Sequence, residues 1–176
     1  MATATHLPIS VYEYLHTSYR PDCDYVDGAI EERHLGELDH SEVQRALLLW
    51  LSQYGHEWGV EIYPEIRIQV NATRFRVADL CLVARTAPRE QIIQTPPFAV
   101  IEILSPEDRV NRYQQRLEDY REMGIQYIWV VDPATRKGFD CSTGNWVEAS
   151  QFSISDSQWS LNLEQVFAEI DKSRQH

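Results

Sequence analysis

The chain has 176 residues, 43% of them hydrophobic, and a formal net charge of −11 at pH 7. Its length predicts one domain over residues 1–176 with a hydrophobic core. No apolar run approaches the roughly 20 residues that span a bilayer, no secretory signal is evident, and the three widely spaced cysteines form neither a zinc motif nor a disulfide framework. We therefore expect a cytoplasmic protein with reduced thiols and no membrane contact. The negative charge excludes nucleic-acid binding driven by overall attraction, unless the 16 Lys and Arg residues gather on one face.

The N-terminal third of the chain is predicted to contain two helices and a hairpin. A short helix is expected at 9–16, and a hairpin within 20–33 turns at Asp27-Gly28, a strong turn signal. Apolar residues recur every three or four positions through 40–54, which predicts a helix with one apolar face.

The central part of the chain, residues 39–132, is predicted to hold the core sheet. The stretches 60–70 and 75–84 alternate between apolar and polar residues, and 98–104 is an almost continuous apolar run. Short connections predict that these three strands are largely antiparallel. We expect the even-numbered apolar residues of 60–70 to share one face.

A helix at 110–123 is followed by a buried strand at 127–131, which predicts a parallel, right-handed crossover from the preceding strand. The C-terminal part (138–170) is expected to add two short strands and a terminal helix over 160–170. Together these elements predict an α/β (α+β) domain with a mixed β-sheet flanked by helices.

Two acidic residues interrupt predicted core strands, Asp79 within RVADLCLVA and Glu102 within FAVIEIL. A carboxylate in a buried strand is costly unless it is paired, hydrogen-bonded or bound to a metal. If the two strands are neighbours, alternation brings the two carboxylates within reach of one ion. Mg²⁺ or Mn²⁺ takes such ligands, and the backbone carbonyl of Ile103 can supply a further oxygen. The sequence therefore predicts a divalent-metal site on Asp79, Glu102 and Ile103.

An arginine partner for each acid is the alternative explanation. Structural ion pairs also retain acids in a core, and Arg76 and Arg116 are the candidate partners. Under this alternative, Asp79 and Glu102 have a structural role only.

The segments VADLCLV, VIEILSPEDR and YQQRLEDYREMGIQYIWVVDP resemble the Uma family of restriction endonucleases, which is abundant in cyanobacteria. The segments DYVDGAIEE and DHSEVQRAL also resemble the opening hairpin and first helix of that family. The resemblance covers the chain from about residue 9 to 132 and implies a restriction-endonuclease-like PD-(D/E)XK core. It also implies an endonuclease that acts on DNA with Mg²⁺ or Mn²⁺.

The resemblance assigns roles to the matching positions. Asp79 matches the aspartate of the PD element, with Ala78 in place of its proline, and Glu102 matches the acid of the (D/E)XK element. Leu104 stands where the lysine of that element would be. In relatives whose lysine has moved onto the following helix, the matching position here is Arg116. Arginine stays protonated, so Arg116 can stabilise charge on a phosphate but cannot easily accept a proton.

Three further residues of the helix at 110–123 are candidates near the phosphate. Arg112 occupies the position of the family's usual aspartate, which places a second cation on that face. Gln114 and Gln115 are nearby and could orient the attacking water in place of a lysine.

His40 and Glu65 complete the set of candidates. His40 lies at the start of a predicted helix, where relatives often carry a histidine, and it could form a hydrogen bond near the cap, neighbour the metal or contact a phosphate. Glu65 precedes the Asp79 strand, and it either approaches the metal or is an exposed strand residue.

Three functions are compatible with these residues. The first is a Mg²⁺-dependent DNA endonuclease in which Asp79 and Glu102 hold the ion and Arg116 stabilises the developing charge. The second is a catalytically weak or inactive nuclease-fold protein that binds DNA or a protein, favoured by the missing lysine and the net charge of −11. The third is a small-molecule hydrolase that uses the same metal site.

Cutting both strands of DNA requires two active sites, so we expect a homodimer with C₂ symmetry. The aromatic residues Trp146, Phe152 and Trp159 are candidates for its apolar interface. An interface of this kind requires these side chains at the surface of each subunit.

Overall fold

The computed structural model describes residues 7–33, 37–105, 110–154 and 159–175, except for the side chains of 110–112. Within these residues the main sheet has eight strands, seven of them in the order β2-β1-β4-β5-β6-β7-β8, and β3 pairs with β4 outside this path. A second sheet consists of β9 and β10. The elements in chain order are α1 (Val11–His16), β1 (Cys23–Val26), β2 (Ala29–Glu32), α2 (Leu38–Tyr54), β3 (Val60–Asn71), β4 (Arg74–Ala84), β5 (Ala99–Ile103), α3 (Val110–Met123), β6 (Tyr127–Asp132), β7 (Lys137–Asp140), β8 (Val147–Ala149), β9 (Gln151–Ser153), β10 (Ser160–Asn162) and α4 (Leu163–Ser173).

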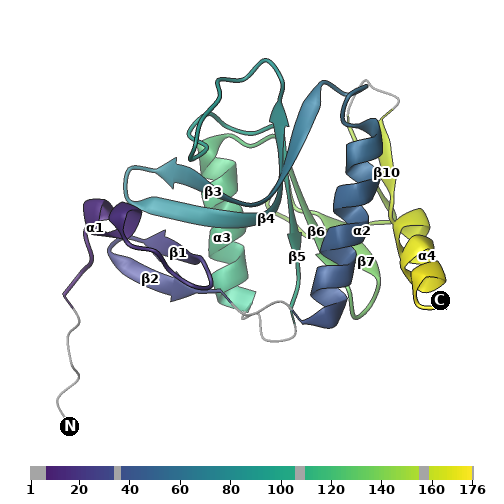
Figure 1. Cartoon of the computed structure of the whole chain (residues 1–176), viewed down its shortest axis with the longest axis horizontal. Coiled ribbons are helices and arrows are strands. Elements are labelled where there is room, and N and C mark those ends of the chain that lie inside the picture. The colour runs from purple at the N-terminus through teal and green to yellow at the C-terminus, as the bar shows by residue number, and fades with distance from the viewer. Residues whose placement is uncertain (1–6, 34–36, 106–109, 155–158, 176) are drawn as a thin grey trace, which may run out of the picture.

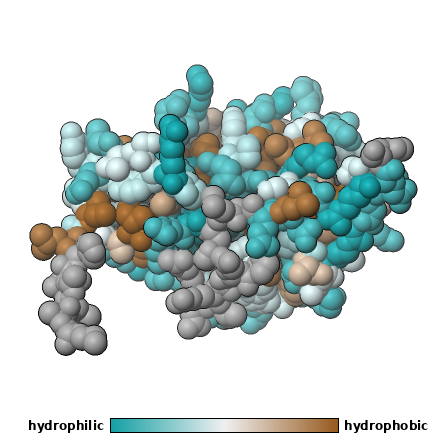
Figure 2. All heavy atoms as spheres, turned by 60° about the horizontal axis from the view of Figure 1, so that its bottom comes forward, coloured by the Kyte–Doolittle hydropathy of each residue, from teal (hydrophilic) through white to brown (hydrophobic). Residues whose placement is uncertain are grey.

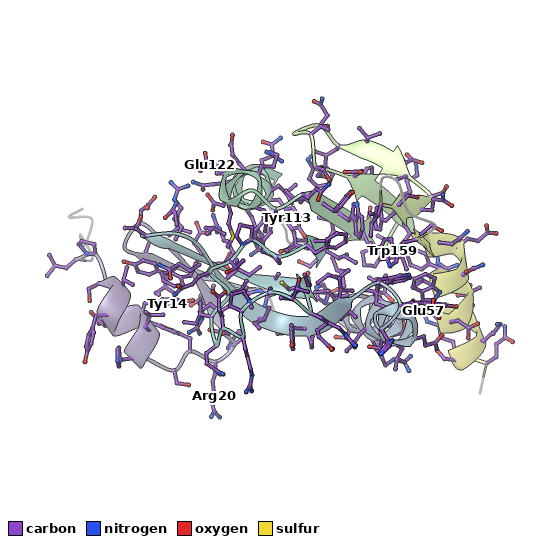
Figure 3. The ribbon with its side chains drawn as sticks, turned by 90° about the horizontal axis from the view of Figure 1, so that it is seen from above. Tyr14, Arg20, Glu57, Tyr113, Glu122 and Trp159 are labelled. Atoms are coloured by element: carbon purple, nitrogen blue, oxygen red, sulfur yellow. The ribbon has the colours of Figure 1, made fainter. Side chains whose placement is uncertain are left out.

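Helices α2 and α3 lie on opposite faces of the main sheet, and α4 packs beside α2 (Figure 1, Figure 3). Each face has its own hydrophobic cluster. Leu47 of α2 packs in one cluster with Leu80 of β4, whereas Leu117 of α3 packs in the other cluster with Cys81 of β4. Leu80 and Cys81 therefore point to opposite faces, as alternation along a strand requires.

The strand pairings confirm the predicted connectivity of the core. The pairs β3–β4 and β4–β5 are antiparallel, whereas β5 and β6, which α3 connects, are parallel. All five residues of β5 are buried, because helices cover both faces of the sheet at this strand. The predicted α/β class with a mixed sheet between helices is confirmed.

Strand β3 changes the face that its apolar side chains cover at Glu65. Val60 and Ile62 pack in the cluster under α2, whereas Ile66 and Ile68 pack in the cluster under α3. Glu65 has a φ of 50°, a conformation that residues with a side chain seldom adopt, and the alternation reverses at this residue. The prediction that the even-numbered apolar residues of this strand share one face was therefore wrong.

The hairpin formed by β1 and β2 is attached to the core through β4 and α1. Strand β1 pairs with β4, and the ring of Tyr14 on α1 stacks on Tyr25 with centroids 4.9 Å apart. Gly28 in the hairpin turn has a φ of 94°, and a Cβ at this position would lie 2.7 Å from the Cβ of Pro8. Glycine is therefore required where α1 and the hairpin meet.

The C-terminal part contains a strand pair that the sequence did not predict. Strands β9 and β10 form a separate antiparallel sheet. Helix α4 begins at Leu163, later than expected, because the side chain of Asn162 caps it by accepting a hydrogen bond of 3.2 Å from the backbone N–H of Gln165.

Two of the aromatic residues expected at a dimer interface belong to the core of the chain itself. Phe152 and Trp159 are buried in the cluster under α2, and both stack on the ring of Trp129. They cannot contribute to an apolar interface without opening this core, so this part of the prediction was wrong. Trp146 has 37% of its surface exposed.

On the face shown in Figure 2 the surface is mainly hydrophilic, and its apolar side chains form small groups. The exposed large hydrophobic residues include Leu7 beside α1 and Leu38 at the start of α2. In the described part of the chain, no helix combines the length and apolar character needed to cross a membrane.

Candidate functional site

Asp79 and Glu102 face each other on neighbouring strands. The antiparallel register of β4 and β5 ends at Leu80 with Ile101, and Asp79 and Glu102 are the next residue of each strand beyond this pair. Both side chains are buried. The backbone N–H of Ile103 donates a 2.8 Å hydrogen bond to Oδ2 of Asp79, which links the two strands directly at the acids. The predicted juxtaposition of the two acids follows from this register.

Three groups outside β5 surround Asp79. The guanidinium of Arg33, just after β2, is hydrogen-bonded to Oδ1 of Asp79. Nε2 of His40 on α2 lies 3.3 Å from Oδ2 of the same carboxylate. The side-chain amide of Gln44, one turn further along α2, donates a 3.0 Å bond to the backbone carbonyl of Asp79. The hairpin and α2 therefore hold this carboxylate from two sides.

Glu65 lies on the other side of Asp79, on β3. The neighbouring pairs, Pro64 with Leu80 and Ile66 with Ala78, place Glu65 opposite Asp79. Arg33 is bonded to Glu65 as well as to Asp79. Glu65, Asp79 and Glu102 thus form a row of three acids across β3, β4 and β5, which we call the acidic row.

Glu102 is held by α3. Nη1 of Arg116 donates a 2.9 Å hydrogen bond to Oε2 of Glu102, and the hydroxyl of Tyr120 donates a 2.5 Å bond to Oε1. Arg116 and Tyr120 are four positions apart, so they lie on the same face of the helix. The second terminal nitrogen of Arg116, Nη2, donates a 2.9 Å bond to Asp24 of β1.

Asp24 is fully buried and connects the hairpin to the site. Its Oδ1 accepts a 2.9 Å bond from the backbone N–H of Val77, and its Oδ2 accepts bonds from both Arg76 and Arg116. Arg76 is also buried and bonds to Asp119 on α3. This network fixes the direction from which Arg116 approaches Glu102.

The environment drives the pKa values of the two facing carboxyls apart. Burial raises the pKa of Glu102 to about 7, against the lowering effect of Arg116 and with a further raising effect from Asp79. Burial also acts to raise the pKa of Asp79, but the hydrogen bond from His40 and the charge of Arg33 outweigh it, and that pKa lies below its ordinary value. Asp79 therefore carries the stable negative charge of the pair.

The pKa of His40 is shifted by the same contact with Asp79. Burial acts to lower its pKa, but the hydrogen bond to Asp79 and the charge of Asp79 raise it above its ordinary value. His40 is therefore a neighbour of the site that stabilises an ionised Asp79, in line with one of the roles expected for it.

The alternative explanation, in which each acid pairs with an arginine, named the correct partner for Glu102 but not for Asp79. Arg116 pairs with Glu102 as that alternative expected. Arg76 does not pair with Asp79, because its guanidinium is taken up by Asp24, Glu31 and Asp119. Arg33 could not be predicted as a partner of Asp79, because its position depends on how the hairpin docks.

Two other site residues could have been found from the sequence. Asp24 is a carboxylate between Cys23 and Tyr25 in a strand, the same pattern that identified Glu102. Tyr120 lies one turn beyond Arg116 on the apolar stripe of α3, so the helical repeat places it beside the same acid.

The other candidates on α3 are Gln114, Gln115 and Arg112. Gln114 and Gln115 are exposed, and in the part of the chain that the structure describes no hydrogen bond links either to the acidic row. The side chain of Arg112 lies outside the described residues. Glu65, by contrast, joins the site through Arg33 and through a 2.7 Å bond from Gln44.

The facing carboxylates suit a hard divalent cation, although the donor set is small. Among the described residues, no group of three or more His, Cys, Asp or Glu side chains could hold a metal. Mg²⁺ often takes only one or two carboxylates and completes its shell with water and substrate phosphate. Burial raises the pKa of Glu102 to about 7 although Arg116 acts to lower it, so an added cation would favour the ionised carboxylate. Asp79 and Glu102 therefore fit an ion that two carboxylates share.

The family model named Uma2, described as "Putative restriction endonuclease", matches residues 11–172. The chain belongs to the Uma2 family. The family resemblance predicted from the motifs is therefore confirmed, and it supports a nuclease of the restriction-endonuclease type.

Solved structures agree with this Uma2 assignment at the level of the fold. A structure described as a "putative nuclease belonging to DUF820" from Anabaena variabilis ATCC 29413 matches with a TM-score of 0.80 and 20% identity, over 93% of this chain and 99% of that chain. A DrdV–DNA complex matches with a TM-score of 0.45 and 14% identity, over 75% of this chain and 11% of that chain, which is too weak to support an argument. No curated protein matches the sequence.

Proposed function

We propose that this Uma2 chain is a single-domain, divalent-metal-dependent endonuclease that hydrolyses phosphodiester bonds of DNA. The observation that carries the proposal is the position of two buried acids, Asp79 and Glu102, opposite each other on adjacent strands. Membership of a family described as restriction endonucleases supports the reaction class.

In this proposal Asp79 and Glu102 hold Mg²⁺ or Mn²⁺, with the backbone carbonyl of Ile103 as a further ligand. The ion, when bound, activates a water and stabilises charge on the phosphate. Asp79 is suited to the role because His40 and the N–H of Ile103 keep its carboxylate ionised and oriented.

Arg116 supplies positive charge beside Glu102. Asp24 and Glu102 raise the pKa of its guanidinium, although burial opposes them, so it stays protonated. It can therefore stabilise negative charge that develops on the phosphate, but it does not accept the proton of the attacking water. Gln115, which is exposed on the same helix, is proposed to orient that water, with Arg112 and Gln114 as further contacts to the phosphate.

Cleavage of supercoiled plasmid tests the proposal. We expect nicking with Mg²⁺ or Mn²⁺, no nicking with EDTA, and a loss of roughly 100-fold or more in Asp79→Asn and Glu102→Gln. Glu61→Gln is the matched control, because Glu61 is an exposed acid of β3 that pairs with Arg85 away from the acidic row. A folded wild-type protein that cuts with neither ion contradicts the proposal.

We also propose a homodimer, since cutting both strands needs two sites. Light scattering at micromolar concentration should give the mass of two chains. A strictly monomeric species would remove the dimer from the proposal without affecting the single-strand chemistry.

A second candidate function is a nuclease-fold protein that binds DNA or a protein without cutting. The arginine pairing of both acids favours it, because Arg33 and Arg116 already balance Asp79 and Glu102. Under this alternative, Asp79→Asn and Glu102→Gln bind DNA as the wild type does, and no variant or wild-type sample cleaves it with metal.

A further inference from the structure

Arg33 reaches the acidic row from outside the core. It follows strand β2, and its two terminal nitrogens bond to different strands, Nη1 to Glu65 on β3 and Nη2 to Asp79 on β4. Its side chain is 12% exposed. The carboxylates of Asp79 and Glu65 raise the pKa of Arg33 although burial opposes them, so the residue is a permanent cation.

The two oxygens of Asp79 have different partners among the described residues. Oδ2 accepts the N–H of Ile103 and lies within hydrogen-bonding distance of His40. Oδ1 is bonded to Arg33. A cation that binds Asp79 without breaking the link to β5 must therefore take Oδ1, the atom that the guanidinium covers.

We propose that Arg33 is a built-in competitor of the divalent ion, which occupies Oδ1 of Asp79 in the metal-free protein and moves away when the ion binds. This inference rests on the proposed metal site at Asp79 and Glu102. Arg33 is a positioning residue here: it sets the affinity for the ion and keeps the acids in place before the ion arrives.

The surroundings of Arg33 allow such a movement, whereas those of Arg116 oppose it. The Glu65 side chain is 46% exposed, so the outer end of the Arg33 bridge opens to solvent. Arg116 is held at its other end by Asp24, which is fully buried. A guanidinium that leaves Asp79 can retain Glu65 in water, but one that leaves Glu102 would have to disrupt a buried network.

Charge gives the reason for a competitor at this place. Glu65, Asp79 and Glu102 lie on three adjacent strands, and like charges directly opposite each other destabilise a sheet. Arg33 compensates two of these acids when no ion is present. A divalent ion at Oδ1 takes over this compensation and repels the guanidinium, so the two cations exclude each other.

Mn²⁺ binding to the metal-stripped full chain tests the proposal. The fraction of free Mn²⁺, measured by electron paramagnetic resonance, gives the affinity without any cleavage assay. We expect Arg33→Gln to bind Mn²⁺ roughly tenfold more tightly than the wild type, because the binding-competent state no longer competes with the guanidinium. Without the ion, the same variant should melt at a lower temperature, and Mn²⁺ should restore more of its stability than it adds to the wild type.

Arg67→Gln is the matched control. Arg67 is a partly buried arginine of β3 that pairs with Asp22, outside the acidic row. Its loss should leave the Mn²⁺ affinity unchanged. An equal gain in Arg33→Gln and Arg67→Gln would reflect net charge alone and would overturn the proposal.

The remaining outcomes are also decisive. Mn²⁺ affinity in Arg33→Gln that equals or falls below the wild-type value overturns the role of Arg33 while leaving the metal site intact. If neither protein binds Mn²⁺, the metal site itself is wrong and this inference falls with it. Should Arg33→Gln not fold, Arg33→Lys replaces it: a lysine cannot hold Glu65 and Asp79 with a planar fork, so its Mn²⁺ affinity must exceed that of the wild type.

Discussion

The hydroxyl of Tyr120 donates a 2.5 Å hydrogen bond to Oε1 of Glu102, from one turn beyond Arg116 on α3. The two donors together occupy both oxygens of this carboxylate. Glu102 is thus oriented by a single helix face. The hydroxyl of Tyr120 can be removed by Tyr120→Phe with little change in the shape of the side chain.

Tyr120→Phe should therefore destabilise the metal-free protein by about 2 kcal/mol, because a buried carboxylate loses a hydrogen-bond donor. Urea denaturation at a pH above the pKa of Glu102 measures the change. Tyr63→Phe is the control, since Tyr63 is an exposed tyrosine of β3. Equal stability of Tyr120→Phe and the wild type would show that the hydroxyl bond contributes nothing.

Glu102 should make the metal-free protein less stable as the pH rises. Burial raises its pKa from 4.5 to about 7, so the native state keeps a proton that the unfolded state has released. The stability due to this proton is fully present below the unfolded value and is lost as the pH rises through about 7, by at most about 3 kcal/mol. Urea denaturation in EDTA, between about pH 5 and about pH 8, measures the loss.

In Glu102→Gln this loss should be smaller, because the amide does not titrate. His40, whose pKa is also raised, contributes in the same direction and is present in both proteins. The difference between the two pH profiles therefore isolates Glu102. Parallel profiles would contradict the raised pKa.

Asp24→Asn should destabilise the protein by about 3 kcal/mol, because it removes the negative partner shared by two buried guanidiniums. Burial acts to raise the pKa of Asp24, but Arg116 and Arg76 outweigh it and hold the value below its ordinary range. The stabilisation is therefore present at neutral pH and lost only as the pH falls through the lowered value. Thermal melts at neutral pH compare this variant with Asp27→Asn, which changes an exposed acid of the same hairpin.

The facing pair could be predicted because two local rules are sufficient for it. Strands β4 and β5 are antiparallel neighbours across the connection formed by residues 85–98, and an acid inside an apolar strand of each marks the place where they meet. Neither rule depends on the rest of the molecule. The position of Asp79 opposite Glu102 therefore follows from the sequence once the strands are assigned.

Other parts of the site depend on tertiary structure that has no local signal. Arg33 reaches Asp79 only because the hairpin docks beside β4, 46 positions away in the chain. The reversal at Glu65 comes from a positive φ at a residue that seldom adopts it. The apolar–polar alternation therefore continues through residue 65 in the sequence, although the side chains of the strand change face there. The burial of Phe152 and Trp159 likewise depends on β9 and β10, which are too short to show a clear period.

The hairpin contributes one residue to each of the facing acids, Arg33 to Asp79 and Asp24, through Arg116, to Glu102. A fluctuation that detached β1 from β4 would take Arg33 away from Asp79 and Asp24 away from Arg116 in the same event. Hairpin docking and assembly of the acidic centre are thus a single cooperative unit of local opening. Amide protons of β1 should exchange with solvent at the same rate as those around Asp79, and the opening of the hairpin would set how often the centre is dismantled.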